Sequence, residues 1–315
     1  MATIRGWFQA AILLTSISVI SGCNRGGPDI ILPDSPMVDV GKIKEGTGPS
    51  FSSTDNLTDP KEILNRVTKA LYSVNSALTN YSIDVTYDLR GMQGHHQQLV
   101  TIYRINPQPE KVRRILMDQE SGSHDYYVDG SNFTTYQRIS NTYIRQECRG
   151  NITELARRLD EASPMILGTS SFLTNKVGIN FLTNLKLNGK EVVKKRDCYV
   201  VDAKFLPSFL IELARRSRFQ PGIVPITGSA KLWIDAQNYS LVKSIADIGV
   251  QVKDPKSMFT KVVHQIWTQS LHKLILNPVL DDNTFAFTPP PKAQEIFTQR
   301  ETPTTPTTTD PFAVK

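Results

Sequence analysis

Cysteine is scarce in this chain, and its spacing argues against one class of chemistry. The 315 residues include three cysteines, Cys23, Cys148 and Cys198, and no pair has Cys-x-x-Cys spacing. Thiol–disulfide oxidoreductases depend on that spacing, so we expect no catalytic dithiol. Cys148 and Cys198 lie in strand-like segments. Either a disulfide between them or two buried free thiols fits the sequence.

Histidine is also rare, and its placement does not suggest a metal site. His95 and His96 are adjacent in a turn, so their side chains diverge, and His124, His264 and His272 are isolated in the sequence. A metal ion needs several ligands that converge on one point. We therefore expect no metal and no cofactor.

Motifs that carry enzyme chemistry are missing as well. The sequence contains no Gly-x-Ser-x-Gly elbow, no phosphate-binding loop and no dinucleotide-binding glycine pattern. Nothing in the sequence calls for catalysis, and we expect the protein not to be an enzyme.

Long hydrophobic runs are limited to the first residues, and even these are too short to span a bilayer. Arg5 precedes an apolar stretch from Ala10 to Ile20, which has the layout of a secretory signal. The stretch ends in Ile20-Ser21-Gly22-Cys23, which resembles a bacterial lipobox with isoleucine where leucine is usual. This predicts removal of residues 1–22 and acylation of Cys23. The alternative is an ordinary secretory signal followed by a chance cysteine.

The predicted leader places the protein in the bacterial envelope, anchored to a membrane and facing the periplasm. Asn24 follows the lipidated cysteine where an aspartate could stand, which favours the outer membrane. No later apolar run approaches the length of a transmembrane helix, so the acyl chains are expected to be the only attachment.

The net charge of the chain is weakly positive and gives only a mild preference for anionic partners. The chain carries +6, and removal of Arg5 with the leader leaves +5 (6 − 1) on the mature protein. This suits anionic lipid head groups, whereas nucleic acid requires a clustered basic face. We expect a monomer that binds no nucleic acid.

Composition divides the mature chain into three parts. Residues 23–56 are rich in Gly, Pro, Ser and Asp and predict a flexible linker, and residues 298–315 predict a disordered Thr/Pro-rich tail. Residues 57–297 between them have the length and composition of one folded domain.

The domain begins with a helix and continues mainly as strands. Asp59-Pro60-Lys61-Glu62 combines an N-cap, a first-turn proline and a capping-box glutamate, and an apolar stripe of about five turns follows. From Tyr81 to Cys148 apolar and polar residues alternate between short turns, which predicts an antiparallel meander. Strands resume at Phe181, with turns expected at Asn188-Gly189 and at Asp235–Asn238 and a last short strand at Phe285–Phe287. Residues 151–178 predict helical segments.

One helical segment interrupts the second run of strands. Residues 206–219 place Phe209, Leu210 and Leu213 on one side of a short helix, and the segment ends in three arginines, Arg215, Arg216 and Arg218. An apolar side beside a basic end suits a membrane surface, so this helix is a candidate mobile lid or membrane contact. The alternative is a helix docked permanently on the sheet.

The order of these elements and three short stretches resemble a known superfamily. The stretches are Asp125-Tyr126-Tyr127-Val128-Asp129-Gly130, Lys231-Leu232-Trp233-Ile234-Asp235 and Phe285-Ala286-Phe287-Thr288-Pro289-Pro290. Together they resemble the LolA/LolB-like superfamily of lipoprotein carriers and receptors. Within it, they are most similar to a predicted periplasmic family without assigned function.

The resemblance implies an α+β fold, an unclosed antiparallel half-barrel wrapped around helices with an apolar cavity that accepts acyl chains. The candidate lining residues are Tyr81, Ile83, Val85, Trp233, Trp267, Phe285 and Phe287. The alternative is that these aromatic residues fill a solid core. The implied function is binding of a lipid or an acylated lipoprotein, for carriage or insertion. The alternative on the same fold is an RseB-like sensor of envelope stress or protein-interaction module.

Overall fold

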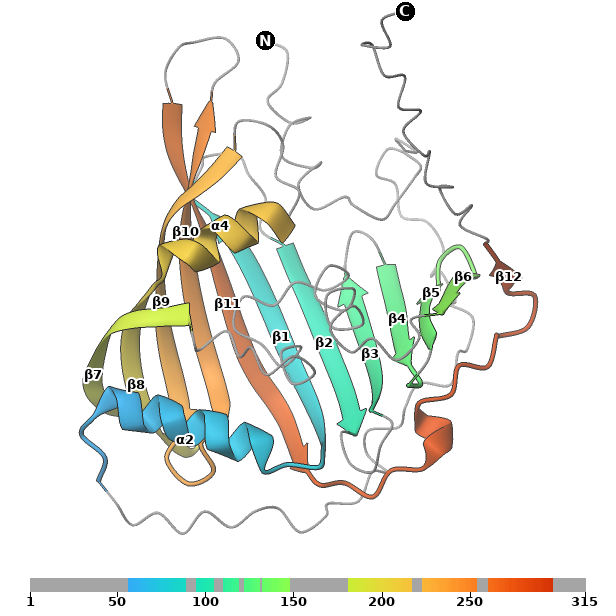
Figure 1. Cartoon of the computed structure of the whole chain (residues 1–315), viewed down its shortest axis with the longest axis horizontal. Coiled ribbons are helices and arrows are strands. Elements are labelled where there is room, and N and C mark those ends of the chain that lie inside the picture. Colours follow the sequence, from blue (N-terminus) through green and yellow to red (C-terminus); the bar gives the residue numbers. More distant parts are fainter. Residues whose placement is uncertain are drawn as a thin grey trace, which may run out of the picture.

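One sheet of twelve strands carries the fold, and its two edges do not meet (Figure 1). The structure is a computed structural model that describes residues 56–88, 95–104, 110–118, 122–130, 132–147, 181–216, 223–253 and 260–296. The predicted leader, most of the linker, the helical segments expected in 151–178 and the tail therefore lie outside the described residues.

The first helix of the described chain forms where its capping residues predict it. Helix α2 (Pro60–Tyr72) starts behind Asp59, whose side chain accepts a hydrogen bond from the Lys61 backbone N–H at 2.9 Å. The helix is 13 residues long, shorter than the five turns expected. It ends early because the chain turns at Ser73, and the Asn75 backbone N–H donates to Asn277 Oδ1 at 3.0 Å, directly before the first strand.

The strands form two antiparallel meanders. The first comprises β2 (His95–Arg104), β3 (Lys111–Asp118), β4 (Gly122–Val128), β5 (Asn132–Gln137) and β6 (Thr142–Glu147). The second comprises β7 (Leu182–Val193), β8 (Arg196–Phe205), β9 (Ile223–Asp235), β10 (Leu241–Lys253) and β11 (Thr260–Leu276). Strand β1 (Ser76–Tyr87) pairs with both β2 and β11 and so joins the two meanders.

The strand order confirms the prediction of an unclosed antiparallel half-barrel. The order is β12-β6-β5-β4-β3-β2-β1-β11-β10-β9-β8-β7, and the pairs are antiparallel except β12 with β6. Helix α2 and helix α4 (Pro207–Arg216) cross the same side of this sheet, which we call the inner face (Figure 1). The opposite side is the outer face.

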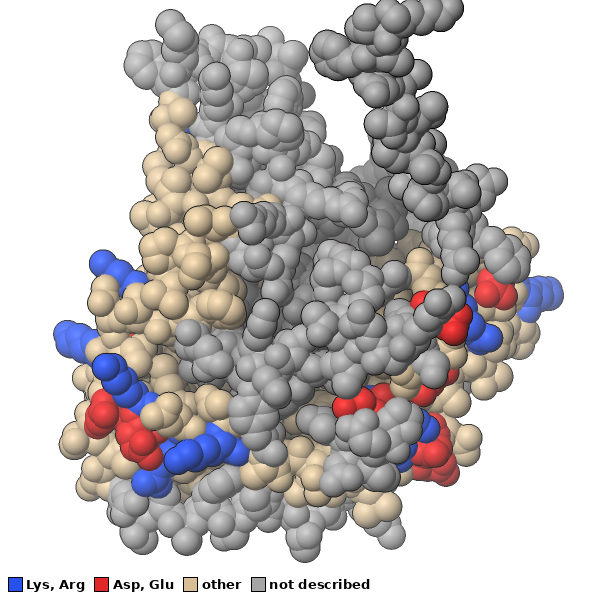
Figure 2. All heavy atoms as spheres, in the orientation of Figure 1, with Lys and Arg blue, Asp and Glu red and all other residues tan. Residues whose placement is uncertain are grey.

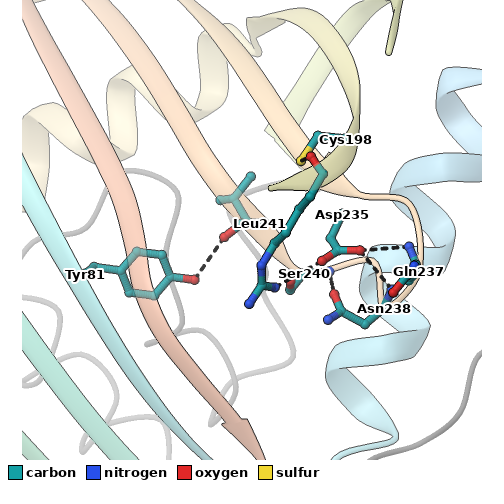
Figure 3. A network of polar contacts seen from close by, with 8 residues as sticks. Tyr81, Cys198, Asp235, Gln237, Asn238, Ser240 and Leu241 are labelled. Atoms are coloured by element: carbon teal, nitrogen blue, oxygen red, sulfur yellow. Dashed lines mark hydrogen bonds and ion pairs between the residues drawn. The ribbon is translucent and has the colours of Figure 1, made fainter. Parts of the chain in front are cut away.

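Two turn predictions have different outcomes. Asp235 ends β9 and its carboxylate accepts from the Gln237 N–H at 2.8 Å, so the turn at Asp235–Asn238 is confirmed (Figure 3). The turn predicted at Asn188-Gly189 is wrong. Strand β7 continues through both residues with a bulge, and the chain reverses at Lys194 and Lys195, which have φ values of 50° and 65°.

The end of the domain also departs from the prediction. Residues 285–287 do not form a strand; a short 3-10 helix, η4 (Asp282–Thr284), precedes them. The chain then crosses the outer face and adds the two-residue strand β12 (Gln294–Glu295) alongside β6. None of the helices in the described part of the chain has the length and apolar character needed to cross a bilayer.

Candidate functional site

The inner face is apolar beneath the two helices. Side chains of α2 and α4 pack there against strands β8–β11 in a group that we call the first inner cluster. Its largest fully buried members are Ile63 from α2 with Tyr199, Leu232 and Tyr239 from the sheet and its turns. The stripe that the sequence places on one side of α2 therefore contacts this half of the sheet.

The other half of the inner face carries a second inner cluster. It comprises Val74, Ala77, Ile83, Val85, Leu99, Tyr103, Val112, Leu116, Tyr126, Val128 and Phe133. Among the described residues no helix contributes to this cluster, whose members come from β1–β5 and from Val74. The predicted lining residues Ile83 and Val85 thus lie on the inner face.

Trp267 connects the two inner clusters. It lies on β11 opposite Val85 of β1 and Ala246 of β10, and it packs against both clusters. The indole Nε1 is buried and has no hydrogen-bond partner among the described residues. Two positions along β11, the Gln269 Oε1 accepts from the Ser244 hydroxyl at 3.0 Å while its Nε2 is buried without a partner in the described chain.

Tyr81 of β1 lies on the same face, and its side chain extends toward strands β9 and β10. Its hydroxyl donates to the Leu241 carbonyl oxygen at 3.3 Å, next to the β9–β10 turn (Figure 3). Burial raises the pKa of Tyr81 above the usual tyrosine range, against a smaller opposing effect of Arg196. The group therefore remains a neutral phenol at physiological pH.

Trp233 was expected to line the cavity, and this is wrong: it faces outward. Its neighbours Leu232 and Ile234 belong to the first inner cluster, so strand alternation directs Trp233 to the outer face. There it packs with Cys198, and its Nε1 donates to Glu191 Oε2 at 2.8 Å.

Phe285 and Phe287 also lie on the outer face, which corrects their assignment to the lining. Phe285 packs with Leu78, Ile102 and Ile275. Phe287 contacts one tyrosine from each of β4, β5 and β6, with its ring centroid 5.1 Å from that of Tyr127, 5.7 Å from that of Tyr136 and 5.1 Å from that of Tyr143. The reason is the path of the chain after η4, which runs across the outside of the sheet.

The apolar side of α4 docks on the inner face. Leu210 belongs to the first inner cluster, and Phe209 and Leu213 pack against it. The Phe209 ring lies 5.0 Å from that of Phe205 and 5.1 Å from that of Phe181. These contacts match the docked alternative. The side chains of Arg215 and Arg216, and all of Arg218, lie outside what the structure describes.

Cys198 carries a free thiol on the outer face. Burial raises its pKa to about 11, which makes it a poor nucleophile near neutral pH. Cys148, its possible disulfide partner, lies outside the described residues.

Polar side chains in the described residues pair with one another and do not converge into a catalytic or metal-binding group. His264 Nδ1 lies 2.7 Å from Asp247 Oδ1, and this hydrogen bond raises the pKa of His264. No group of three His, Cys, Asp or Glu side chains converges as a metal site in the described ranges. Ser240 and Lys243 have Ser-x-x-Lys spacing, which some enzymes use for catalysis, but this sequence lies at the start of a strand, and Lys243 Nζ is 4.7 Å from the Trp233 ring centroid. It does not have the helical geometry that aligns such a pair.

The geometry defines a class of protein: an open antiparallel half-barrel whose inner face is apolar and partly covered by helices. The chain belongs to the family described as "Predicted periplasmic protein (DUF2092)", whose model matches residues 61–298. This confirms the family predicted from the sequence and places the protein in the periplasm.

Solved structures with related folds have low identity to this chain. The Mycobacterium tuberculosis lipoprotein LppX is 14% identical, with 71% of this chain and 99% of that chain covered and a TM-score of 0.40. LprF from Mycobacterium bovis is 12% identical, covering 69% and 92%, with a TM-score of 0.38. A LolA superfamily protein from Nitrosomonas europaea is 12% identical, covering 73% and 99%, with a TM-score of 0.25. No curated protein matches the chain.

The structure places the predicted residues Tyr81, Ile83, Val85 and Trp267 on the inner face, beside residues that the sequence reasoning did not name. Leu99, Tyr103 and Tyr126 belong to the second inner cluster, and all three occupy alternating positions in predicted strands. The alternation of apolar and polar residues could have identified them as buried. Assigning them to the inner face required the strand register, which only the fold supplies.

Proposed function

We propose that this protein is a membrane-anchored periplasmic lipoprotein that binds an acyl chain of a lipid or of another lipoprotein. The chain would lie against the inner face, and the protein would carry it through the envelope or insert it into a membrane. This function requires no covalent chemistry.

One observation carries the proposal: the inner face carries two apolar clusters, and Trp267 packs against both and so connects them. An unclosed sheet must cover such a face with helices or with a ligand. Each methylene removed from water contributes about 0.8 kcal/mol, so a dozen methylenes supply roughly 10 kcal/mol before ordering costs.

The remaining organisation follows the sequence. Residues 1–22 would be removed as a signal peptide, Cys23 acylated, and residues 23–56 would tether the domain of residues 57–297 to the membrane, with residues 298–315 as a tail. Asn24 favours the outer membrane. We propose a monomer that contacts the membrane surface through this anchor and binds no nucleic acid.

A second candidate, a sensor or protein-interaction module, is favoured by an exposed apolar rim. Val224, Ile226 and Val262, on the projecting ends of β9 and β11, are 52%, 42% and 42% exposed. In Figure 2 the described surface at these strand ends is mostly uncharged. Exposed apolar patches commonly mark protein or membrane contacts.

Tryptophan quenching separates the two candidates, because the sequence has three tryptophans and the predicted leader removes Trp7. Trp233→Phe leaves inner-face Trp267 as the only reporter, and Trp267→Phe leaves outer-face Trp233 as the matched control. Both variants are made in the mature Cys23→Ala chain. They are titrated with a lysophospholipid whose acyl chain carries bromine, which quenches indole on contact.

If the protein binds an acyl chain, the brominated lipid should quench the fluorescence of Trp267 saturably and leave the fluorescence of Trp233 unchanged. If the protein is only a sensor, the lipid should quench neither tryptophan below the critical micelle concentration. That result would overturn the proposal. Organic extraction of the purified Cys23→Ala protein followed by mass spectrometry gives an independent check, because a carrier retains acyl species.

A further inference from the structure

A row of polar side chains crosses the second inner cluster. The strand register places Tyr126 of β4 opposite Arg114 of β3, Arg114 opposite Thr101 of β2, and Thr101 opposite Thr79 of β1. Directly paired residues of antiparallel strands point to the same side of the sheet. Tyr126 belongs to the second inner cluster, so the whole row faces inward.

The two threonines supply hydroxyl groups that nothing in the described chain satisfies. Thr79 and Thr101 are each 2% exposed, and the Oγ1 atoms of both have no hydrogen-bond partner there. A buried hydroxyl without a partner is costly, and threonine has no need to occupy a strand position where valine packs equally well. This pattern points to a hydrogen-bonding ligand.

Two phenols flank the threonine pair. Tyr81 lies two positions beyond Thr79 on β1, and Tyr103 lies two positions beyond Thr101 on β2, on the same face. Burial raises the pKa of Tyr103, and its proximity to Tyr81 raises it further. Both groups therefore stay neutral beside the threonines, and the Tyr81 hydroxyl donates its proton to the Leu241 carbonyl oxygen at 3.3 Å.

Arg114 gives the row a positive charge. Its side chain is 1% exposed, and its charge acts on the Tyr126 phenol by lowering the pKa that burial raises. The adjacent Arg113 faces outward, where its Nη2 lies 3.7 Å from Asp125 Oδ2. Asp118, an acidic residue four positions along β3 that also faces inward, raises the pKa of Tyr126 and accepts a hydrogen bond from Gln97 at 2.8 Å.

We propose that this row binds the anionic head group of an amphiphile whose acyl chain lies along the second inner cluster. Arg114 supplies the charge, and the Thr79 and Thr101 hydroxyls supply hydrogen-bond donors to carboxylate or phosphate oxygens. This inference rests on the proposed acyl-binding function and specifies its ligand as acidic.

A matched pair of ligands tests the head group separately from the chain. The reporter is the mature Cys23→Ala, Trp233→Phe protein. It is titrated with an omega-brominated eleven-carbon fatty acid and with the corresponding alcohol, at a pH where the acid is ionised. We expect the acid to bind at least about tenfold more tightly than the alcohol.

Two variants and a control locate the effect. Thr79→Val combined with Thr101→Val keeps the branched shape and removes the hydroxyls, and Arg114→Gln removes the charge. Each is expected to weaken acid binding about tenfold and leave alcohol binding unchanged. Thr134→Val is the control, because Thr134 is a buried threonine (3% exposed) opposite outward-facing Tyr127.

The outcomes are distinguishable. If acid and alcohol quench Trp267 with equal affinity, the head-group proposal is wrong while acyl binding stands. If neither ligand quenches, the proposed function itself fails. Displacement of the acid by millimolar inorganic phosphate without a chain would show a free-anion site and overturn the assignment to an amphiphile. The wild-type comparison decides the matter even if a variant does not fold.

Discussion

At the scale of single residues, the alternation of side-chain direction along β3 places two adjacent arginines in different environments. Arg114 faces the second inner cluster. Arg113 faces the outer side, and its guanidinium carbon lies 5.0 Å from the Tyr127 ring centroid. The outer group centres on Asp125, which is fully buried. It accepts hydrogen bonds from Arg138 Nε at 3.0 Å and Nη2 at 2.8 Å and from the Tyr127 hydroxyl at 3.2 Å. This ionic group lies under the segment that carries Phe287.

Replacing Asp125 should therefore destabilise the whole domain. Asp125→Asn removes the negative charge between two buried guanidinium groups, and breaking a buried pair in this way costs about 3–5 kcal/mol. Urea unfolding followed by circular dichroism measures the loss.

Asp84→Asn is the control for the Asp125 prediction. Asp84 pairs with His96 at 2.6 Å, but the side chains of Asp84 and His96 remain 49% and 46% exposed. Loss of such a surface pair costs less than about 1 kcal/mol. Equal effects of the two substitutions would contradict the role assigned to Asp125.

At the scale of elements, the two helices cover one half of the inner face and leave the other half to strands. Helix α2 is positioned by its cap and by the tie between Asn75 and Asn277, and α4 by the stacking of Phe209 on Phe205 and Phe181. The second inner cluster has no such helix among the described residues. This asymmetry places the candidate site over β1–β5.

The docking of α4 leads to a prediction about membrane binding. Because its apolar side is engaged with the sheet, replacing Arg215, Arg216 and Arg218 with Gln should leave the binding of the Cys23→Ala protein to anionic vesicles unchanged. Vesicle sedimentation at low and high salt measures this.

Weaker and less salt-sensitive binding of the triple variant would instead support an interfacial lid. Leu210→Ala provides the complementary control, because Leu210 is 6% exposed in the first inner cluster. Its truncation should cost about 2–5 kcal/mol of stability if α4 is docked.

At the scale of the whole molecule, attachment and ligand binding are divided between separate parts of the chain. The sheet places its apolar face inward and its ionic and aromatic clusters outward, where the segment from η4 to β12 covers β4–β6. The proposed anchor lies at Cys23, ahead of the domain. Attachment should therefore be removable without disturbing the fold.

Cys23→Ala is expected to release the protein from the membrane. The thioether lipid forms only on that sulfur, so the variant should fractionate as a soluble periplasmic protein or remain unprocessed. Cell fractionation with a high-salt wash measures the distribution, and Cys148→Ala is the control that should stay with the membrane. Retention of the Cys23→Ala protein in the washed pellet would show that the anchor lies elsewhere.

The sequence alone determined the elements and the class of fold, because these depend on local patterns. The cap at Asp59, the alternation in β1 and the turn at Asp235 each act over a few residues. Their order was enough to predict an open antiparallel half-barrel and the periplasmic family. The family resemblance also nominated a set of lining residues: Tyr81, Ile83, Val85, Trp233, Trp267, Phe285 and Phe287.

Only the tertiary structure decided which side of the sheet each residue occupies. Trp233 and Trp267 have the same chemistry and similar strand contexts, yet one faces outward and the other joins the two inner clusters. Phe285 and Phe287 lie outside because the chain crosses the outer face after η4, a path with no local signal. The polar row from Tyr126 to Thr79 exists only through the register of four strands, since each of its residues is unremarkable in its own strand. Side-chain direction repeats every two residues, so a shift of one residue in register would send all four to the other face.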